Sequence, residues 1–364
     1  MKLRVGVVGA GNISPIYLQA PSKFSALEVT AISDLDLDRA RSRAEEFGIP
    51  RALPLDELLS SEDVDVVLNL TVPAAHADVS LAALGAGKHV YSEKPLATDL
   101  EAGRRVLDLA TERGLRVGCA PDTFLGAGLQ TARKALDDGL IGEPVAATAF
   151  MMSHGPERWH PNPDFFYQPG AGPMFDMGPY YLTALVNMLG PVRRVTSSAR
   201  ASLPERVAGT EPGGRRIPVN TPTHVASVLD FEAGPVATLV TSFDVWAADV
   251  PRIEIYGTEG TLSLPDPNTF GGPVRVRRML EDDWETLPLT HPFAENSRGI
   301  GLADMVTALG SGRPHRASGD LALHVLEIMH ATLHASEAGR HIEIESRPGR
   351  PEALPVAAGE EVLR

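Results

Sequence analysis

The sequence predicts an α/β protein in which a parallel sheet comes first and a region of mainly antiparallel strands follows. In the first ~120 residues, short valine-rich apolar runs alternate with helical segments, which is typical of parallel strands covered on both faces. Over residues 194–264 apolar and polar residues alternate instead, as they do in antiparallel strands with one covered face. The 364 residues suffice for two domains, because one domain has roughly 100–200 residues.

The parallel strands are expected where short apolar runs lie between helical segments. These runs are residues 3–9, 29–34, 64–71, 89–92 and 115–119. The helices between them are expected at residues 36–47, 77–85 and 100–113. Gly48, Gly87 and Gly114 follow these helices, where a left-handed residue commonly ends a helix. We therefore assign residues 1–122 to a parallel-sheet domain.

The second part is expected to be a separate α/β domain over residues 123–346. Its expected helices are residues 124–138, 177–189, 300–309 and 320–337. Its expected strands include residues 145–152, 224–231, 237–243 and 341–345. Residues 204–220 are interpreted as a polar surface loop. The tail, residues 347–364, is rich in Pro, Gly and Glu and is expected to be loose.

Composition argues against several classes of protein. The formal net charge of −14 disfavours nucleic acid and anionic membranes as partners, because both need a basic surface. The one cysteine, Cys119, lies in an apolar run and is interpreted as a buried small hydrophobe, so no disulfide is expected. A strand-like run at the start, in place of a signal peptide, predicts a cytoplasmic protein. No His, Asp and Glu set has metal-ligand spacing, so no metal is expected.

The segment Gly9-Ala10-Gly11-Asn12-Ile13-Ser14 directly follows the first strand and opens a helix. In a Rossmann dinucleotide-binding domain the first glycine makes the tight turn and the second lets the backbone approach the pyrophosphate. Asn12 and Ile13 would complete that contact, and the small Ser14 stands where the third glycine is expected. The alternative is a tight strand-to-helix turn without a ligand. The strand on one side and the helix on the other favour the dinucleotide interpretation.

Asp34 closes the second strand near the position where an acidic residue binds the adenine ribose. Its carboxylate would accept hydrogen bonds from both ribose hydroxyls and would repel a 2′-phosphate. Leu35 follows it rather than an arginine, although Arg39 is nearby. We therefore expect NAD as the cofactor and keep NADP as the alternative.

Two further segments carry a resemblance to a known family. Residues 71–76 read Thr-Val-Pro-Ala-Ala-His after the third strand, and residues 87–96 contain Glu93-Lys94-Pro95 after the fourth. With this spacing the chain resembles the Gfo/Idh/MocA family of sugar and cyclitol dehydrogenases, whose hallmark is Glu-Lys-Pro. The resemblance implies a Rossmann domain followed by an α/β domain with a large open, mainly antiparallel sheet. It also implies a homodimer or homotetramer.

The resemblance also implies roles for single residues. Lys94 matches the family's active-site lysine. Asp176 and Tyr180 match an Asp-x-Gly-x-His pattern, with tyrosine where most members have histidine; glucose–fructose oxidoreductases look similar in using tyrosine there. The cofactor contacts expected beside the glycine turn and Asp34 are Thr71, Pro73, His76, Glu93, Lys94 and Asp122. His76 would line the nicotinamide side, and Asp122 would contact the nicotinamide ribose or amide.

Oxidation of an alcohol by NAD needs a group that takes the hydroxyl proton. Asp176 and Tyr180 are four residues apart on an expected helix and therefore share one face. An ammonium at ~4 Å is worth about 4 kcal/mol at an effective dielectric of 20, enough to make a tyrosine a base near neutral pH. Tyr180 activated by Lys94, and Lys94 acting directly with Tyr180 as a relay, both stay open. Structural alternatives are an N-cap role for Asp176 and a core role for Tyr180.

Residues 154–168 form a loop rich in aromatic and polar side chains. Trp159 offers a flat apolar face for a pyranose, and His160 offers a partner for a hydroxyl, as a polyol site requires. The alternative is a loop braced by prolines that serves packing.

These observations predict an NAD(P)-dependent oxidoreductase acting on a hydroxyl or keto group of a sugar, glycoside or cyclitol. Lys94, Trp159, His160, Asp176 and Tyr180 are the expected substrate contacts. The alternatives are an NADPH-dependent reductase of a keto- or anhydro-sugar and an NAD-dependent glycosidase that works by transient oxidation. A cofactor-sensing protein without turnover is disfavoured by the presence of all three expected catalytic residues.

Overall fold

The computed structural model describes residues 2–209 and 214–363 of the chain. It divides into two compact units. The first unit comprises Met1–Ala127, Thr290–Leu326 and Pro351–Arg364, and the second comprises Gly128–Leu289 and Glu327–Arg350.

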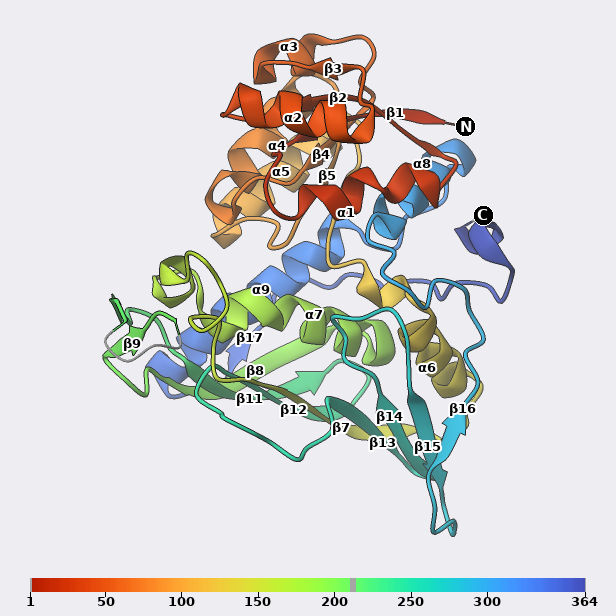
Figure 1. The fold of residues 1–364 in the computed structure, drawn as a ribbon. Helices are drawn as coiled ribbons and strands as arrows, with labels where there is room; N and C mark the ends of the chain where they lie inside the picture. The colour runs from red at the N-terminus through yellow and green to blue at the C-terminus, as the bar shows by residue number, and fades with distance from the viewer. Residues whose placement is uncertain (1, 210–213, 364) are drawn as a thin grey trace. The chain divides into compact units, whose positions relative to one another are not determined.

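The first unit is built on a six-stranded parallel sheet with the order β3-β2-β1-β4-β5-β6 (Figure 1). Its strands are β1 (Leu3–Val8), β2 (Leu27–Ser33), β3 (Arg51–Ala52), β4 (Val66–Asn69), β5 (His89–Ser92) and β6 (Val117–Cys119). All four residues of β4 are buried, because helices cover both faces of the sheet. The strand order reverses direction between β1 and β4, and ligands of such sheets bind where this reversal occurs.

The helices of the first unit follow the strands in alternation. They are α1 (Ser14–Leu18), α2 (Leu37–Phe47), α3 (Leu55–Ser60), α4 (His76–Gly85), α5 (Leu100–Glu112) and α8 (Ile300–Ser311). Short 3-10 turns lie at η1 (Ala20–Ser22), η2 (Pro73–Ala75), η3 (Thr123–Leu125) and η5 (Gly359–Leu363). Asp36 caps α2 and Asp99 caps α5 by accepting hydrogen bonds from backbone amides of the first turn.

The second unit contains a nine-stranded sheet with the order β16-β15-β14-β13-β7-β12-β11-β8-β17. Its strands are β7 (Pro144–Met152), β8 (Val192–Arg200), β11 (His224–Phe231), β12 (Val236–Ser242), β13 (Ile253–Gly257), β14 (Gly260–Leu264), β15 (Val274–Arg278), β16 (Glu285–Leu287) and β17 (Ile342–Glu343). Among the pairings that the structure describes in this sheet, β7–β12 is parallel and the others are antiparallel.

Helices cover one face of this sheet. They are α6 (Ala127–Asp137), α7 (Gly172–Leu189) and the part of α9 (Gly319–Ala338) that belongs to the second unit (Figure 1). Along β11, Val225 and Leu229 are fully buried, whereas Val228 between them is 36% exposed. This alternation shows that one face of the sheet packs on helices and the other stays open.

The predicted fold class is confirmed: a parallel six-stranded sheet precedes a large, mostly antiparallel one. The predicted strands at residues 89–92 and 224–231 coincide with β5 and β11. The short β3 and α3 were not predicted, because two strand residues and six helical residues give too little periodicity. Part of the expected polar loop, residues 204–220, forms a two-stranded sheet of β9 (Glu205–Val207) and β10 (Arg216–Pro218); residues 210–213 of that loop lie outside the described residues.

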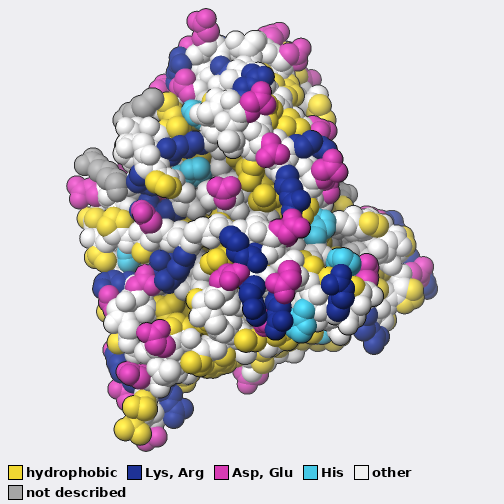
Figure 2. Space-filling model, turned by 180° about the vertical axis from the view of Figure 1, so that it is seen from behind, with side chains coloured by type: hydrophobic (Ala, Val, Ile, Leu, Met, Phe, Trp, Pro, Cys, Tyr) yellow, Lys and Arg dark blue, Asp and Glu magenta, His cyan; other side chains and the backbone are white. Residues whose placement is uncertain are grey.

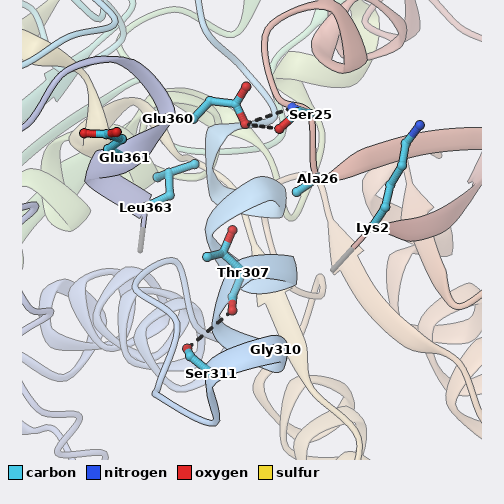
Figure 3. A pocket seen from close by; sticks show the side chains of 9 residues that line it. All are labelled: Lys2, Ser25, Ala26, Thr307, Gly310, Ser311, Glu360, Glu361 and Leu363. Carbon is cyan, nitrogen blue, oxygen red and sulfur yellow. Dashed lines mark hydrogen bonds between the residues drawn. The ribbon is translucent and has the colours of Figure 1, made fainter.

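The structure differs from the expected domain division at the C-terminal end. Thr290–Leu326 and Pro351–Arg364 belong to the first unit rather than to a second domain and a loose tail. Leu354, Val362 and Leu363 of the tail are buried. The Glu360 carboxylate accepts hydrogen bonds from the Ser25 amide at 2.9 Å and the Ser25 hydroxyl at 2.8 Å (Figure 3). Burial of these three apolar side chains therefore outweighs the Pro- and Glu-rich composition of this segment.

Basic and acidic side chains stand next to one another over much of the face shown in Figure 2. Several charged side chains of the molecule form exposed ion pairs, such as Arg41–Asp38 and Arg278–Glu285. Among the residues described, none of the helices combines the length and the apolar character needed to cross a membrane.

Candidate active site

The turn between β1 and α1 is shaped by its two glycines. Gly9 has a φ of +106°, and a Cβ placed there would lie 2.6 Å from the Leu70 carbonyl oxygen after β4. At Gly11, by contrast, an added Cβ would meet no described heavy atom within 4 Å beyond its chain neighbours. The Ser14 hydroxyl, fully buried, donates to the Gly11 carbonyl at 2.8 Å and closes the turn. The turn is thus pressed against the sheet at Gly9 and open at Gly11, which is the shape that a pyrophosphate requires.

Asp34 follows β2 and is held by the same turn. One carboxylate oxygen accepts from the Ala10 amide at 2.7 Å, and the other accepts from the Asp36 amide at 2.9 Å and from Arg39 at 2.8 Å. These hydrogen bonds and the Arg39 charge lower the pKa of Asp34 against the opposing effect of its burial, so it is ionised at neutral pH. A carboxylate has more than three lone-pair directions, so Asp34 retains acceptor capacity for a ribose hydroxyl.

Apolar side chains are exposed beside the glycine turn, at the ends of three neighbouring strands. Ile13 is 38% exposed, Val72 is 67% exposed, and Leu35 is fully exposed. Asn12 and Pro73 are exposed as well, and Thr71 is half-buried. Exposed large hydrophobics at the carboxyl edge of a parallel sheet indicate a surface that a flat, partly apolar ligand covers.

His76 does not face this surface. Its side chain is fully buried, with Nδ1 at 2.6 Å from the Pro95 carbonyl oxygen and Nε2 at 3.0 Å from that of Thr71. Burial lowers the pKa of His76, and its hydrogen bonds to the two carbonyls oppose this. The imidazole is therefore enclosed between the Thr71 and Pro95 carbonyls, and its expected contact with the nicotinamide stays a prediction.

The Glu93-Lys94-Pro95 segment follows β5 and is held by its acidic residue. Glu93 accepts from the Tyr17 hydroxyl at 2.7 Å through one oxygen and from the Lys94 amide at 2.9 Å through the other. The Glu93 side chain thus fixes the backbone of Lys94, whose own side chain is half-exposed. The peptide bond between Lys94 and Pro95 is cis. Through these two hydrogen bonds Glu93 positions the backbone of Lys94. The expected contact of Glu93 with the cofactor stays a prediction.

Asp122 is also enclosed rather than exposed to a ligand. Its side chain is 1% exposed, and one carboxylate oxygen accepts from the amides of Gly299 at 2.8 Å and Gly301 at 3.1 Å, at the start of α8. Burial raises the pKa of Asp122 to about 6, and the two amides oppose that rise. Tertiary packing thus brings the start of α8 onto this carboxylate, and the expected contact of Asp122 with the nicotinamide ribose or amide stays a prediction.

Asp176 and Tyr180 both lie within α7, which begins at Gly172 rather than at the predicted residue 177. Gly172 and Pro173 resemble a loop in sequence, yet proline fits the first turn of a helix well. The four-residue spacing therefore puts both side chains on one face of α7. Asp176 is half-buried in a helix that is otherwise almost fully buried, and Tyr180 is 8% exposed. The structural alternative of an N-cap role for Asp176 is excluded, because Ala171 precedes the helix.

The loop over residues 154–168 leaves β7 and keeps Trp159 72% exposed. His160 is half-buried, accepts from the Asn162 amide at 3.1 Å, and packs edge-on against Phe165 and Phe166. The loop is thus an aromatic cluster with one exposed indole that can meet a ligand. The expected contact of Trp159 and His160 with a sugar stays a prediction.

This loop is braced from inside by charged side chains that the sequence did not indicate. Arg206 is 4% exposed and contacts Glu157 at 3.2 Å, Asp244, and the face of Tyr167. The sequence did not indicate that Asn69 and Tyr17 support the site either. A polar residue inside the apolar run of β4 was the one signal that could have pointed to Asn69.

Within residues 2–209 and 214–363, no group of three or more His, Cys, Asp or Glu side chains is arranged to hold a metal. Lys94 and the glycine turn belong to the first unit, and Asp176, Tyr180, Trp159 and His160 belong to the second. In the first unit, the structure places the glycine turn, Asp34 and Thr71 together at the carboxyl ends of neighbouring strands. That edge fits a dinucleotide, with backbone amides for phosphate, a carboxylate for ribose and apolar side chains for a base.

Comparison with known proteins agrees with this geometry. Residues 3–120 match the model of the oxidoreductase family with an NAD-binding Rossmann fold. Residues 129–263 match the GFO/IDH/MocA C-terminal domain.

Curated relatives cover nearly the whole chain. A 1,5-anhydro-D-fructose reductase of Ensifer adhaerens is 28% identical over 94% of this chain and 99% of its own. A dTDP-3,4-didehydro-2,6-dideoxy-alpha-D-glucose 3-reductase of Streptomyces violaceoruber is 31% identical over 88% of this chain and 91% of its own.

The solved structure of a levoglucosan dehydrogenase in its apo form has the same fold, with a TM-score of 0.80 at 20% identity over 96% of this chain and 100% of the other. The two family models follow one another along the chain, as the two sheets do in the structure. The protein therefore belongs to the Gfo/Idh/MocA family of oxidoreductases, and its first unit is an NAD(P)-binding Rossmann domain.

Proposed function

We propose that the protein transfers a hydride between a nicotinamide cofactor and a hydroxyl or keto group of a sugar, glycoside or cyclitol. The observation that carries the proposal is the glycine turn at the strand-order reversal, closed at Gly9 and open at Gly11, with Lys94 following β5 on the same sheet. Relatives named for reactions of sugars support the substrate class.

Lys94, Asp176 and Tyr180 are the proposed catalytic residues. The first unit would hold the cofactor, and a bound nicotinamide would supply the acceptor for the hydride of the carbinol carbon. Tyr180 as a phenolate, or Lys94 as a neutral amine, takes the hydroxyl proton as the carbonyl double bond forms. Asp176 is proposed to accept a hydrogen bond from a neighbouring substrate hydroxyl. Trp159 and His160 are proposed to contact the sugar.

NAD is the proposed preferred cofactor. Asp34 is ionised and lies against the Ala10 amide, so its negative charge faces any group bound on the ribose side. That charge disfavours a 2′-phosphate. Arg39 already pairs with Asp34 at 2.8 Å, and a 2′-phosphate would have to compete for it.

Reduction of a keto- or anhydro-sugar with NADPH is the second candidate. It is favoured by the relative named as a 1,5-anhydro-D-fructose reductase, which covers 94% of this chain. The residues are the same, and the proton then moves from Tyr180 or Lys94 to the new alkoxide.

The test is a screen that crosses sugars, cyclitols, glycosides and keto-sugars with both cofactors, followed by absorbance of the reduced nicotinamide. We expect turnover with NAD and a polyol, and a loss of at least about 10²-fold in kcat for Lys94→Ala. Lys134→Ala is the matched control, since Lys134 is an exposed lysine paired with Asp138 and should retain activity.

Tyr180→Phe tests whether the proton passes through the Tyr180 hydroxyl. A loss in kcat as large as that of Lys94→Ala shows that it does, with Tyr180 as base or as relay, whereas a much smaller loss assigns the base to Lys94 alone. Full activity of Lys94→Ala on the best substrate would refute the proposed chemistry. Product formation without net change in NAD would instead indicate a glycosidase.

We also propose a homodimer or homotetramer that uses the open face of the nine-stranded sheet. The register places Phe150, Val228 and Val236 on that face, and Val236 is 43% exposed. Exposed apolar side chains on a flat sheet face favour association with a second copy. Light scattering should give two or four times the protomer mass, and Val236→Lys should lower it. A monomer mass for the unaltered protein at micromolar concentration would contradict this proposal.

A further inference from the structure

Tyr17 lies on α1, the helix that follows the glycine turn, and its side chain is 2% exposed. The ring packs beside the residue that precedes α8, since a Cβ placed at Gly299 would lie 3.9 Å from Tyr17 Cδ1. Burial raises the pKa of Tyr17 well above its ordinary value, and the nearby Glu93 carboxylate raises it further. The phenol therefore keeps its proton and acts as a hydrogen-bond donor.

The Tyr17 hydroxyl is connected to Lys94 through one carboxylate. It donates to Glu93 Oε1 at 2.7 Å, and Glu93 Oε2 accepts from the Lys94 amide at 2.9 Å. A hydrogen bond to a carboxylate is stronger than one between neutral groups, so the phenol restricts the rotation of the Glu93 side chain. Tyr17 thus holds one end of a carboxylate whose other end holds the backbone of the lysine.

The backbone of Glu93 is held separately from its side chain. Its amide donates to the Asn69 carbonyl at 2.9 Å, and its carbonyl accepts a weak hydrogen bond from the Cys119 thiol at 3.6 Å. These contacts come from β4 and β6, the strands on either side of β5. Beyond Glu93 the chain leaves the sheet, and the Lys94 amide is bound by the Glu93 side chain instead. The position of the lysine therefore depends on the orientation of that side chain.

From these contacts we propose that Tyr17 is a positioning residue that holds Lys94 in place through Glu93. The inference rests on the proposed function, because it concerns the lysine that this function makes catalytic. Tyr17 is enclosed, so it acts through Glu93 rather than by contact with a ligand. A small displacement of a catalytic group lowers the rate strongly, which makes such an anchor important for turnover.

Two phenylalanine substitutions test this role. Tyr17→Phe removes the hydroxyl and keeps the ring that packs beside Gly299. Tyr91→Phe is the matched control, because Tyr91 is fully buried on β5 and its hydroxyl has no hydrogen-bond partner among the residues that the structure describes. Both variants lose one buried phenolic oxygen, but only Tyr17→Phe releases the Glu93 carboxylate.

The first readout is hydrogen exchange of the Lys94 amide in the protein without cofactor. We expect Tyr17→Phe to speed this exchange about tenfold, because the released carboxylate covers the amide less of the time. Tyr91→Phe should leave the exchange rate unchanged. The Val90 amide is hydrogen-bonded within the first unit's sheet region and serves as the internal reference, which should keep its rate in both variants.

The second readout is kcat on the best substrate of the screen, with the Kd of NAD measured by calorimetric titration. We expect Tyr17→Phe to lower kcat about tenfold, because the lysine occupies its reactive position less often. The Kd of NAD should stay within about threefold, which separates positioning of the lysine from general loosening of the cofactor domain. In a Glu93→Ala background, Tyr17→Phe should lower kcat no further, because its partner is already absent.

An unchanged exchange rate of Lys94 in Tyr17→Phe, or an equal increase in Tyr91→Phe, would overturn the inference. So would a further loss of kcat when Tyr17→Phe is added to Glu93→Ala, since Tyr17 would then act by another route. If the unaltered protein turns over no substrate of the screen, the proposed function fails, and the exchange measurement alone decides whether Tyr17 holds Lys94.

Discussion

Asp122 shows how a single buried residue can link folding to pH. Its carboxylate caps α8 through the amides of Gly299 and Gly301, and it is almost fully enclosed. Burial raises its pKa from 3.8 to about 6, because a buried site disfavours the charged form. Between these two values the folded protein holds a proton that the unfolded chain has already released.

The free energy of unfolding should therefore decrease between about pH 4 and pH 6 through Asp122. The pKa is raised in the folded state, so the stabilising contribution is present at low pH and is lost as pH rises through about 6, up to about 3 kcal/mol in total. Asp122→Asn keeps an oxygen for the two amides and removes the titration. Urea unfolding at about pH 4.5 and about pH 7 should show that the variant lacks this decrease.

The exposed Asp38 provides the matched comparison. Its side chain is 88% exposed, so Asp38→Asn should follow the unaltered protein across the same pH range. Parallel stability curves for Asp122→Asn and the unaltered protein would disprove the role assigned to Asp122.

At the scale of an element, the β1–α1 turn gives two glycines different tasks. Gly9 is required for folding, since it combines a positive φ with close approach to the Leu70 carbonyl. Gly11 has open space around it, so folding does not require a glycine there, and the missing side chain matters for the approach of a ligand. Both positions are glycines in one short turn. They differ because only Gly9 lies against the backbone of Leu70, which follows β4.

Alanine at each position tests this division. Gly9→Ala should destabilise the protein by roughly 2–4 kcal/mol, because it adds both strain and a backbone clash. Gly11→Ala should leave Tm nearly unchanged and raise the Kd of NAD at least about tenfold, because its methyl group occupies the approach to the pyrophosphate. Thermal unfolding and calorimetric titration measure the two effects. A destabilised Gly11→Ala with unchanged affinity would be the opposite of this expectation.

At the scale of the whole molecule, the chain returns to its first unit after completing the second. Thr290–Leu326 supplies α8, and Pro351–Arg364 supplies the buried Leu354, Val362 and Leu363. The final turn, η5, packs against α8, and Glu360 binds Ser25 in the segment before β2 (Figure 3). The C-terminal segment is thus part of the core of the NAD(P)-binding unit.

Truncating a buried side chain of this segment should therefore destabilise the protein. Leu354→Ala should cost about 2–5 kcal/mol in the free energy of unfolding, because Leu354 is 3% exposed. Val356→Ala, two residues away and 59% exposed, should change it by less than about 0.5 kcal/mol. Urea unfolding compares the two, and equal small effects would return the segment to the loose tail expected from composition.

Local chemistry in the sequence determined much of this protein. The alternation of valine-rich runs and helices predicted the parallel sheet, and the spacing of Gly9, Gly11 and Asp34 predicted where a dinucleotide would meet it. These features depend on periodicity and on backbone conformation, which neighbouring residues decide. Lys94 and Asp176 were singled out by their motifs, and their roles remain predictions.

Long-range packing decided the rest. The sequence could not show that His76 and Asp122 are enclosed, because their partners, Pro95 for one and Gly299 for the other, come from elsewhere in the chain. It could not place the C-terminal segment in the first unit, because burial of Leu354, Val362 and Leu363 depends on the surface that they meet. A polar side chain can face a ligand or hold the backbone of another segment. Tertiary structure decides between the two, because it determines which segments pack against that side chain.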